Sequence, residues 1–123
     1  MQYQPLGSSG LLVSPICLGS MTFGSPVGKS DAVRLVHHAI DAGINFIDTA
    51  NVYEGYDRVL GSAGGVAEKI CGGAIRDRRD RVVLATKVGA PVGPGPQDRG
   101  LSANHIMGQL ERSLKYLQTD FID

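Results

Sequence analysis

The alternation of short apolar runs with amphipathic stretches constrains this chain more than any other feature. Three runs, Ile16–Leu18, Ile44–Ile47 and Arg81–Thr86, suit buried strands, and each is followed by a polar loop and then by residues at helical spacing. Parallel neighbours cannot be joined by tight turns, so strands that alternate with helices form a parallel sheet with helical crossovers. The sequence therefore predicts an α/β fold.

Three helices are predicted in the crossovers. Ser30 and Ser102 can cap the first and third helices, and Gly43 ends the first. Gly72 and Gly73 lie inside the second helix and should each cost about 1 kcal/mol relative to alanine, so this helix is expected to be soft. The predicted apolar faces are Ala32, Leu35, Val36, Ala39 and Ile40; Val66, Ala67, Ile70, Cys71 and Ala74; and Ile106, Leu110, Leu114 and Leu117.

The two ends of the chain complete the predicted organisation. Tyr3–Leu6 and Leu11–Val13 flank a Gly-Ser-Ser-Gly link and read as a short hairpin, while Phe121–Asp123 resembles the opening of a fourth strand. We therefore expect a hairpin over residues 1–14, followed over residues 15–123 by three strand–helix units and the start of strand four.

Polar residues gather at the carboxyl ends of the predicted strands, which favours a (β/α)8 TIM barrel over a doubly wound sheet. Eight strand–helix units need about 250 residues. A chain of 123 residues can supply only the first four units, truncated at strand four, so its first and fourth strands would be open edges. The chain is expected either to be a fragment, the N-terminal half of such a barrel, or to self-associate through these edges.

Charge and composition exclude several classes of partner. Twelve basic residues balance twelve acidic ones, so nothing favours nucleic acid or an anionic membrane as a partner. The N-terminus lacks the pattern of a secretory signal, and a cytoplasmic location is expected. Cys17 and Cys71 are predicted to be buried thiols rather than a disulfide or a metal pair, and no metal site is predicted.

Three residues at the predicted strand ends could form a proton-relay site. If Asp48 and Lys87 lie at neighbouring strand ends and Tyr53 folds back over them, the lysine ammonium would stabilise the tyrosine phenolate, and the hydroxyl would become a usable general acid. Asp48 would keep the ammonium charged and oriented. Spacing alone leaves open a loop cap, an ordinary loop aromatic and a surface lysine.

Four motifs in register make the chain similar to the aldo-keto reductase family over essentially its whole length. They are LGSMTFG at 18–24, INFIDTA at 44–50 with Tyr53 just beyond, LATK at 84–87 and LQTDFID at 117–123. The resemblance implies a barrel that binds NADPH across its C-terminal mouth without a Rossmann domain, and the sequence has no G-x-G-x-x-G motif. It further implies an oxidoreductase that reduces an aldehyde or ketone to an alcohol.

By this resemblance Tyr53 protonates the carbonyl oxygen, Lys87 assists the tyrosine and Asp48 pairs with Lys87. The cofactor-binding residues it implies are Gly19, Ser20, Met21, Thr22 and Asp48. A flexible strand exit is the alternative for 19–22. The segment 54–64 is longer than its counterpart in the family, and the glycines at 61–65 suggest a loop and helix cap more than an anion site; we expect the segment to shape the substrate pocket.

The chain also departs from the family. The family's strand-four histidine, which hydrogen bonds the substrate carbonyl, has no position here, and His37, His38 and His105 fall on predicted helices. Little or no reductase activity is therefore expected of the 123-residue chain by itself. The alternatives are a non-catalytic NADPH-binding barrel subunit and a Schiff-base enzyme that uses Lys87. The physiological substrate and the choice of NADPH over NADH are not fixed by these residues.

Overall fold

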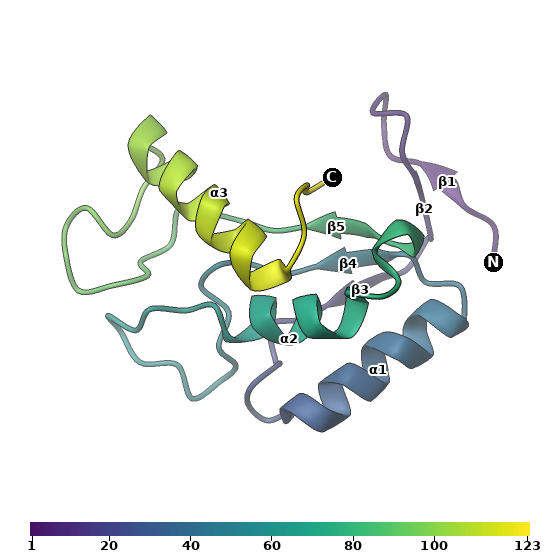
Figure 1. Ribbon diagram of the computed structural model, residues 1–123, viewed down its shortest axis with the longest axis horizontal. Helices are drawn as coiled ribbons and strands as arrows, with labels where there is room; N and C mark the ends of the chain where they lie inside the picture. The colour runs from purple at the N-terminus through teal and green to yellow at the C-terminus, as the bar shows by residue number, and fades with distance from the viewer.

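The computed structural model describes all of residues 1–123 and places three helices beside a small parallel sheet (Figure 1). In chain order the elements are β1 (Gln4–Pro5), β2 (Leu12–Val13), β3 (Cys17–Gly19), α1 (Lys29–Asp41), β4 (Phe46–Asp48), α2 (Val66–Ile75), the 3-10 helix η1 (Arg79–Arg81), β5 (Val83–Ala85) and α3 (Ala103–Leu117). None of the helices combines the length and apolarity that a membrane span requires.

The central sheet has the strand order β3-β4-β5, and its register decides which side chains share a face. Leu18, Ile47 and Leu84 lie side by side in this register. Ile47 and Leu84 are fully buried in the core, and Leu18 packs against it. Because side chains alternate along a strand, the next row points to the opposite face. That row consists of Gly19, Asp48 and Ala85.

The helices cover one face of the sheet, with α2 packed between α1 and α3 (Figure 1). The other face leaves Cys17 exposed and Phe46 and Val83 only half-buried. The predicted α/β class is confirmed, and the three strands form an open sheet rather than a closed barrel.

The hairpin β1–β2 is antiparallel and lies at the amino-terminal end of the sheet. The Tyr3 hydroxyl donates to the carbonyl of Gly43 at 3.0 Å, and the Asn45 side chain donates to the Leu12 carbonyl at 2.9 Å. Gly43 and Asn45 lie just before β4, at its amino-terminal end. These two bonds therefore hold the hairpin away from the carboxyl ends of the strands.

Two predictions about α1 are wrong. Its N-cap is Gly28, whose carbonyl accepts from the Ala32 N–H at 2.9 Å, so Ser30 lies within the first turn and cannot cap it. Leu35, predicted to be in the core, is exposed because it lies at one edge of the apolar stripe. The cap predicted for α3 is confirmed, since the Ser102 side chain accepts from the His105 N–H.

The two cysteines differ in burial, and the prediction for one of them is wrong. Cys71 is buried on α2, as expected, but Cys17 is exposed. Cys17 lies one residue before Leu18, so it points to the face of the sheet that the helices do not cover. An apolar sequence neighbourhood therefore failed to predict the burial of this thiol.

Of the two glycines in α2, the packing explains Gly72 but not Gly73. A Cβ on Gly72 would lie 2.5 Å from the Tyr116 carbonyl oxygen and 2.6 Å from the Leu117 Cα, whereas one on Gly73 would meet nothing within 4 Å. Gly72 therefore permits the close approach of α2 and α3. Every residue of the predicted α2 face except Val66 is buried.

The C-terminal residues do not form the fourth strand that the sequence suggested. Asp123 makes one backbone contact with β5, its N–H donating to the Leu84 carbonyl at 3.1 Å, and a single bond is too little for a ladder. The Asp123 carboxylate accepts from the Leu84 N–H at 2.9 Å and from Arg79 at 2.7 Å. The end of the chain is thus tied beside β5 mainly by side chains.

Candidate active site

The parallel register brings three of the predicted site residues to one edge of the sheet. Asp48 is the last residue of β4 and lies opposite Ala85, the last residue of β5. Lys87 follows Ala85 by two positions, so the side chains of Asp48 and Lys87 both point to the face that the helices leave open. Tyr53 lies in the loop after β4. The Tyr53 N–H donates to the Ala50 carbonyl, and this turn folds the chain back.

The Lys87 ammonium is the centre of this group. Its Nζ lies 2.6 Å from Asp48 Oδ2, 2.9 Å from the Thr49 carbonyl oxygen and 3.1 Å from the Tyr53 hydroxyl oxygen. An ammonium has three donors, and all three are used here. Since the tyrosine oxygen accepts from Lys87, its own O–H remains free to donate to another group.

Electrostatics keep Lys87 charged. Burial alone would lower the pKa of Lys87, but the hydrogen bonds and charges of Asp48 and Tyr53 outweigh it, and the net pKa is raised. The Lys87 side chain is 48% exposed and the Asp48 side chain 32%, so solvent screens the pair and its contribution to stability is small. The pair is better suited to orienting a charge than to holding the fold together.

The predicted cofactor residues 19–22 do not all face the same way. Gly19 is exposed, and a Cβ built on it would meet nothing within 4 Å, so a ligand can approach its backbone closely. Met21 is exposed and Thr22 is half-buried. Ser20 is fully buried; its N–H donates to the Asp48 carbonyl at 3.0 Å, and its side chain points away from the open face.

The three histidines stay away from this group. His37 on α1 contacts the Ala74 carbonyl of α2 at 2.9 Å, His38 is exposed on α1, and His105 lies in the first turn of α3. No set of three or more His, Cys, Asp or Glu side chains is arranged to hold a metal ion.

The glycine-rich segment before α2 is a loop and helix cap in which an aromatic ring covers the helix end. Gly65 is the N-cap in a left-handed conformation, and a Cβ on it would lie 2.4 Å from a ring carbon of Tyr116. Arg112 donates to the Ala63 carbonyl and Arg58 to the Pro91 carbonyl. The segment is therefore tied both to α3 and to the loop after β5.

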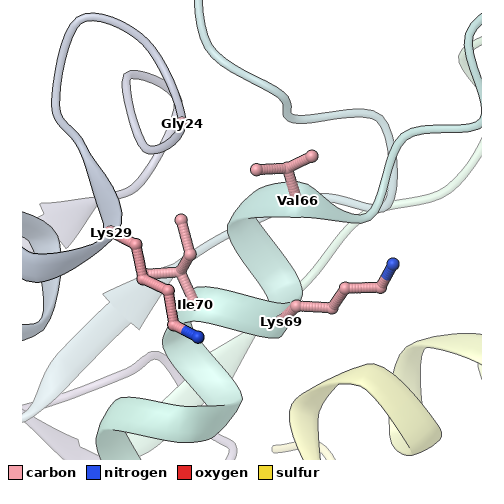
Figure 2. A pocket seen from close by; sticks show the side chains of 5 residues that line it. All are labelled: Gly24, Lys29, Val66, Lys69 and Ile70. Atoms are coloured by element: carbon pink, nitrogen blue, oxygen red, sulfur yellow. The ribbon is translucent and has the colours of Figure 1, made fainter.

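A separate cavity of about 320 Å³ lies on the helical side of the molecule (Figure 2). Gly24, Lys29, Val66, Lys69 and Ile70 line it, and it includes none of the residues around Lys87. The Lys69 ammonium lies 4.4 Å from the centre of the Tyr116 ring and points out of the cavity toward α3 (Figure 2). This cavity is not part of the strand-end site.

Sequence reasoning missed a buried residue behind the site and its contact with the half-buried Thr86. Glu68 on α2 is fully buried, and one of its carboxylate oxygens accepts from the Thr86 hydroxyl at 2.7 Å. A signal was present, because Glu68 stands three and seven residues before Cys71 and Ile75 on the buried side of the helix. A charged residue on an apolar helix face is unusual enough to mark such a position.

Comparisons with known proteins agree on one family. The model of the aldo/keto reductase family matches residues 15–123. An uncharacterized oxidoreductase of Bacillus subtilis, YrpG, is 46% identical over 100% of this chain and 38% of its own length. A probable voltage-gated potassium channel subunit beta of Oryza sativa subsp. japonica is 44% identical over 100% of this chain and 36% of its own.

A solved structure gives the same result. The holo form of the aldo-keto reductase AKR11C1 from Bacillus halodurans superposes with a TM-score of 0.83 at 34% identity, covering 100% of this chain and 38% of that one. The chain thus spans well under half the length of the proteins it matches.

Proposed function

The chain belongs to the aldo/keto reductase family of oxidoreductases, and we propose that Tyr53, Lys87 and Asp48 form the proton-donating part of a site that reduces an aldehyde or ketone with NADPH. The observation that carries this proposal is the Lys87 ammonium, which donates to both Asp48 and the Tyr53 oxygen. This arrangement leaves the tyrosine proton free, and the third lysine proton is donated to the Thr49 carbonyl.

Each residue has one role in the proposal. Tyr53 donates its hydroxyl proton to the carbonyl oxygen of the substrate as the carbonyl carbon is reduced. Lys87 stabilises the phenolate that remains, because its charge lies 3.1 Å from the tyrosine oxygen. Asp48 and the Thr49 carbonyl hold the ammonium in that orientation.

The carboxyl ends of β3 and β4 are the proposed position of a nicotinamide cofactor. The bound cofactor would supply the hydride, while the protein supplies position and electrostatics. Gly19 offers an unobstructed backbone opposite Asp48, and Met21 is exposed beside it, so these residues with Thr22 and Asp48 are proposed to face the cofactor. Ser20 is buried beneath them, and its backbone groups pair with Asp48 and Phe23, so it would contribute by holding this loop in place. The choice of NADPH rests on the family alone.

The Schiff-base alternative is disfavoured by the state of Lys87. A Schiff base begins with attack by a neutral amine, and such lysines usually have a lowered pKa. The pKa of Lys87 is raised instead, and its three protons are all in hydrogen bonds. The non-catalytic alternative remains testable, since a subunit that only binds NADPH would not depend on the Tyr53 proton.

The test compares Tyr53 with a tyrosine remote from the strand ends, in the protein as expressed from its gene. NADPH oxidation with benzaldehyde should fall about 100-fold or more in Tyr53→Phe, the usual range for loss of a general acid. Tyr3→Phe, in the hairpin away from the carboxyl ends of the strands, is the control and should change the rate less than about twofold. A measurable wild-type rate that Tyr53→Phe leaves unchanged would contradict the proposed role.

Self-association is also proposed. The outer edge of β3 has no paired strand, and the sheet face that carries Phe46 and Val83 is incompletely covered. Sedimentation of the 123-residue chain should show dimers or larger species, and a monodisperse monomer that unfolds cooperatively would contradict this.

A further inference from the structure

A row of hydroxyl side chains runs across the three strands directly behind the site. The register places Gly19, Asp48 and Ala85 in one row, so the next row consists of Ser20, Thr49 and Thr86. The ladder continues into it, because the Thr49 N–H donates to the Ala85 carbonyl at 2.9 Å. We call these three residues the hydroxyl row. Alternation turns them toward the helices, while Asp48 and Lys87 face the open side.

Glu68 of α2 meets this row from within the core. Its relative exposure is 0%, and its Oε1 accepts from the Thr86 hydroxyl at 2.7 Å. The second carboxylate oxygen and the hydroxyls of Ser20 and Thr49 are buried and have no hydrogen-bond partner. Burying a carboxyl group is costly, so a fully buried one that makes a single hydrogen bond requires an explanation beyond packing.

The neighbouring thiol does not compete for this role. Burial raises the pKa of Cys71 to about 12, with the Ser20 and Thr49 hydroxyls beside it acting in the opposite direction. Cys71 is therefore a neutral thiol near pH 7 and a weak hydrogen-bonding group. Within the buried layer, Thr86 is the residue that Glu68 holds.

Thr86 is bonded directly to Lys87, and this connects the buried layer to the chemistry. The Lys87 carbonyl accepts from the Asn51 N–H at 3.2 Å. This backbone hydrogen bond is made at Lys87, one residue beyond Thr86, where the loop begins. We propose that Glu68 is a positioning residue: by fixing the Thr86 side chain inside, it fixes the point from which Lys87 reaches Asp48 and Tyr53 outside. This role rests on the proposed function, but the geometry that it predicts can be measured without turnover.

A purely structural role for Glu68 makes a different prediction. If the carboxylate only completes the core, removing its bond to Thr86 would lower stability and leave the surroundings of Lys87 unchanged. If it positions Lys87, the same change would loosen the contacts to Asp48 and Tyr53 that raise the pKa of Lys87. Cys17, Asp48 and Tyr53 are the titratable groups that interact with Lys87, and none of them is altered in the test.

The experiment is an NMR titration of the Lys87 13Cε signal in the 123-residue chain and its variants, with thermal unfolding measured on each. Thr86→Val keeps the shape of the side chain but loses the hydroxyl, and Thr86→Ser keeps the hydroxyl. We expect the Lys87 midpoint to fall by about 0.5 unit or more in Thr86→Val and to stay within about 0.2 unit in Thr86→Ser.

Glu68 supplies the second pair of variants. Glu68→Gln retains an acceptor oxygen for Thr86 and should keep the Lys87 midpoint, whereas Glu68→Met fills the space without an acceptor and should lower it as Thr86→Val does. If Thr86→Val does not fold, the two Glu68 variants decide. A destabilised but folded variant with an unchanged Lys87 midpoint overturns the positioning role. A shifted midpoint supports it even if Tyr53→Phe leaves reductase activity intact, a result that would count against the proposed function alone.

Discussion

The two faces of the sheet differ in what their side chains do. On the covered face, Ile47 and Leu84 are fully buried against the helices and belong to the core. On the open face, Asp48 and Lys87 keep a charged pair in partial contact with solvent. Residues near one another in the same strands thus form the core on one side and the proposed site on the other, and the strand alternation separates the two.

The largest difference between the two faces is expected in the stability effects of two adjacent residues of β5. Leu84→Ala should lower the free energy of unfolding by about 3 kcal/mol, because it removes a fully buried side chain and leaves a cavity. Val83→Ala, on the half-buried open face, should cost less than about 1 kcal/mol. Urea unfolding measures both, and equal losses would show that something covers the open face in solution.

The glycine pair of α2 tests how closely the covering layer packs. Gly72→Ala should destabilise the chain by about 1–3 kcal/mol, because its Cβ would clash with the backbone of α3. Gly73→Ala should stabilise it by roughly 0.5–1 kcal/mol, since alanine favours the helix and the site is open. Changes of the same sign in chemical denaturation would contradict the packing described for α2 and α3.

The two cysteines distinguish the covered face from the open face through the pH dependence of stability and through thiol reactivity. The thiol of Cys71 titrates at about 12 when folded against an ordinary value of 9.0, so above pH 9 the unfolded chain loses its proton first and stability falls as pH rises. Between pH 9 and 10.5 this amounts to about 2 kcal/mol. Cys71→Ala should flatten that part of the stability curve. Iodoacetamide should label Cys17 in the folded chain and Cys71 only on unfolding.

The charged pair of the open face should give the smallest change in stability. Asp48→Asn should lower the pKa of Lys87, since it removes the partner that raises it, and should change the unfolding free energy by less than about 1 kcal/mol. The raised pKa stabilises the fold below the unfolded value and ceases to do so as pH rises through the folded value. Asp31→Asn, which removes an exposed pair with Arg34, is the control and should leave Lys87 unchanged.

Strand-end topology made the site predictable from a single chain. Asp48 and Lys87 each follow an apolar run, and parallel strands place their carboxyl ends at one edge, so their meeting follows from the order of the elements. The Tyr53 contact came from family resemblance, because no spacing rule folds a loop back over a strand end. The Ser30 cap failed because a glycine two residues earlier starts the helix.

The sequence by itself determined the order of the three central strands and three helices, the α/β class, the family and the residues that meet at the strand ends, because these depend on local periodicity and short motifs. Only the tertiary structure decided which side of each strand is covered, and hence why Cys17 is exposed and Cys71 is not. It also decided that Gly72 is needed where two helices meet and that Glu68 reaches Thr86 behind the site. Burial and contact depend on what packs against a residue from far along the chain, which local patterns do not record.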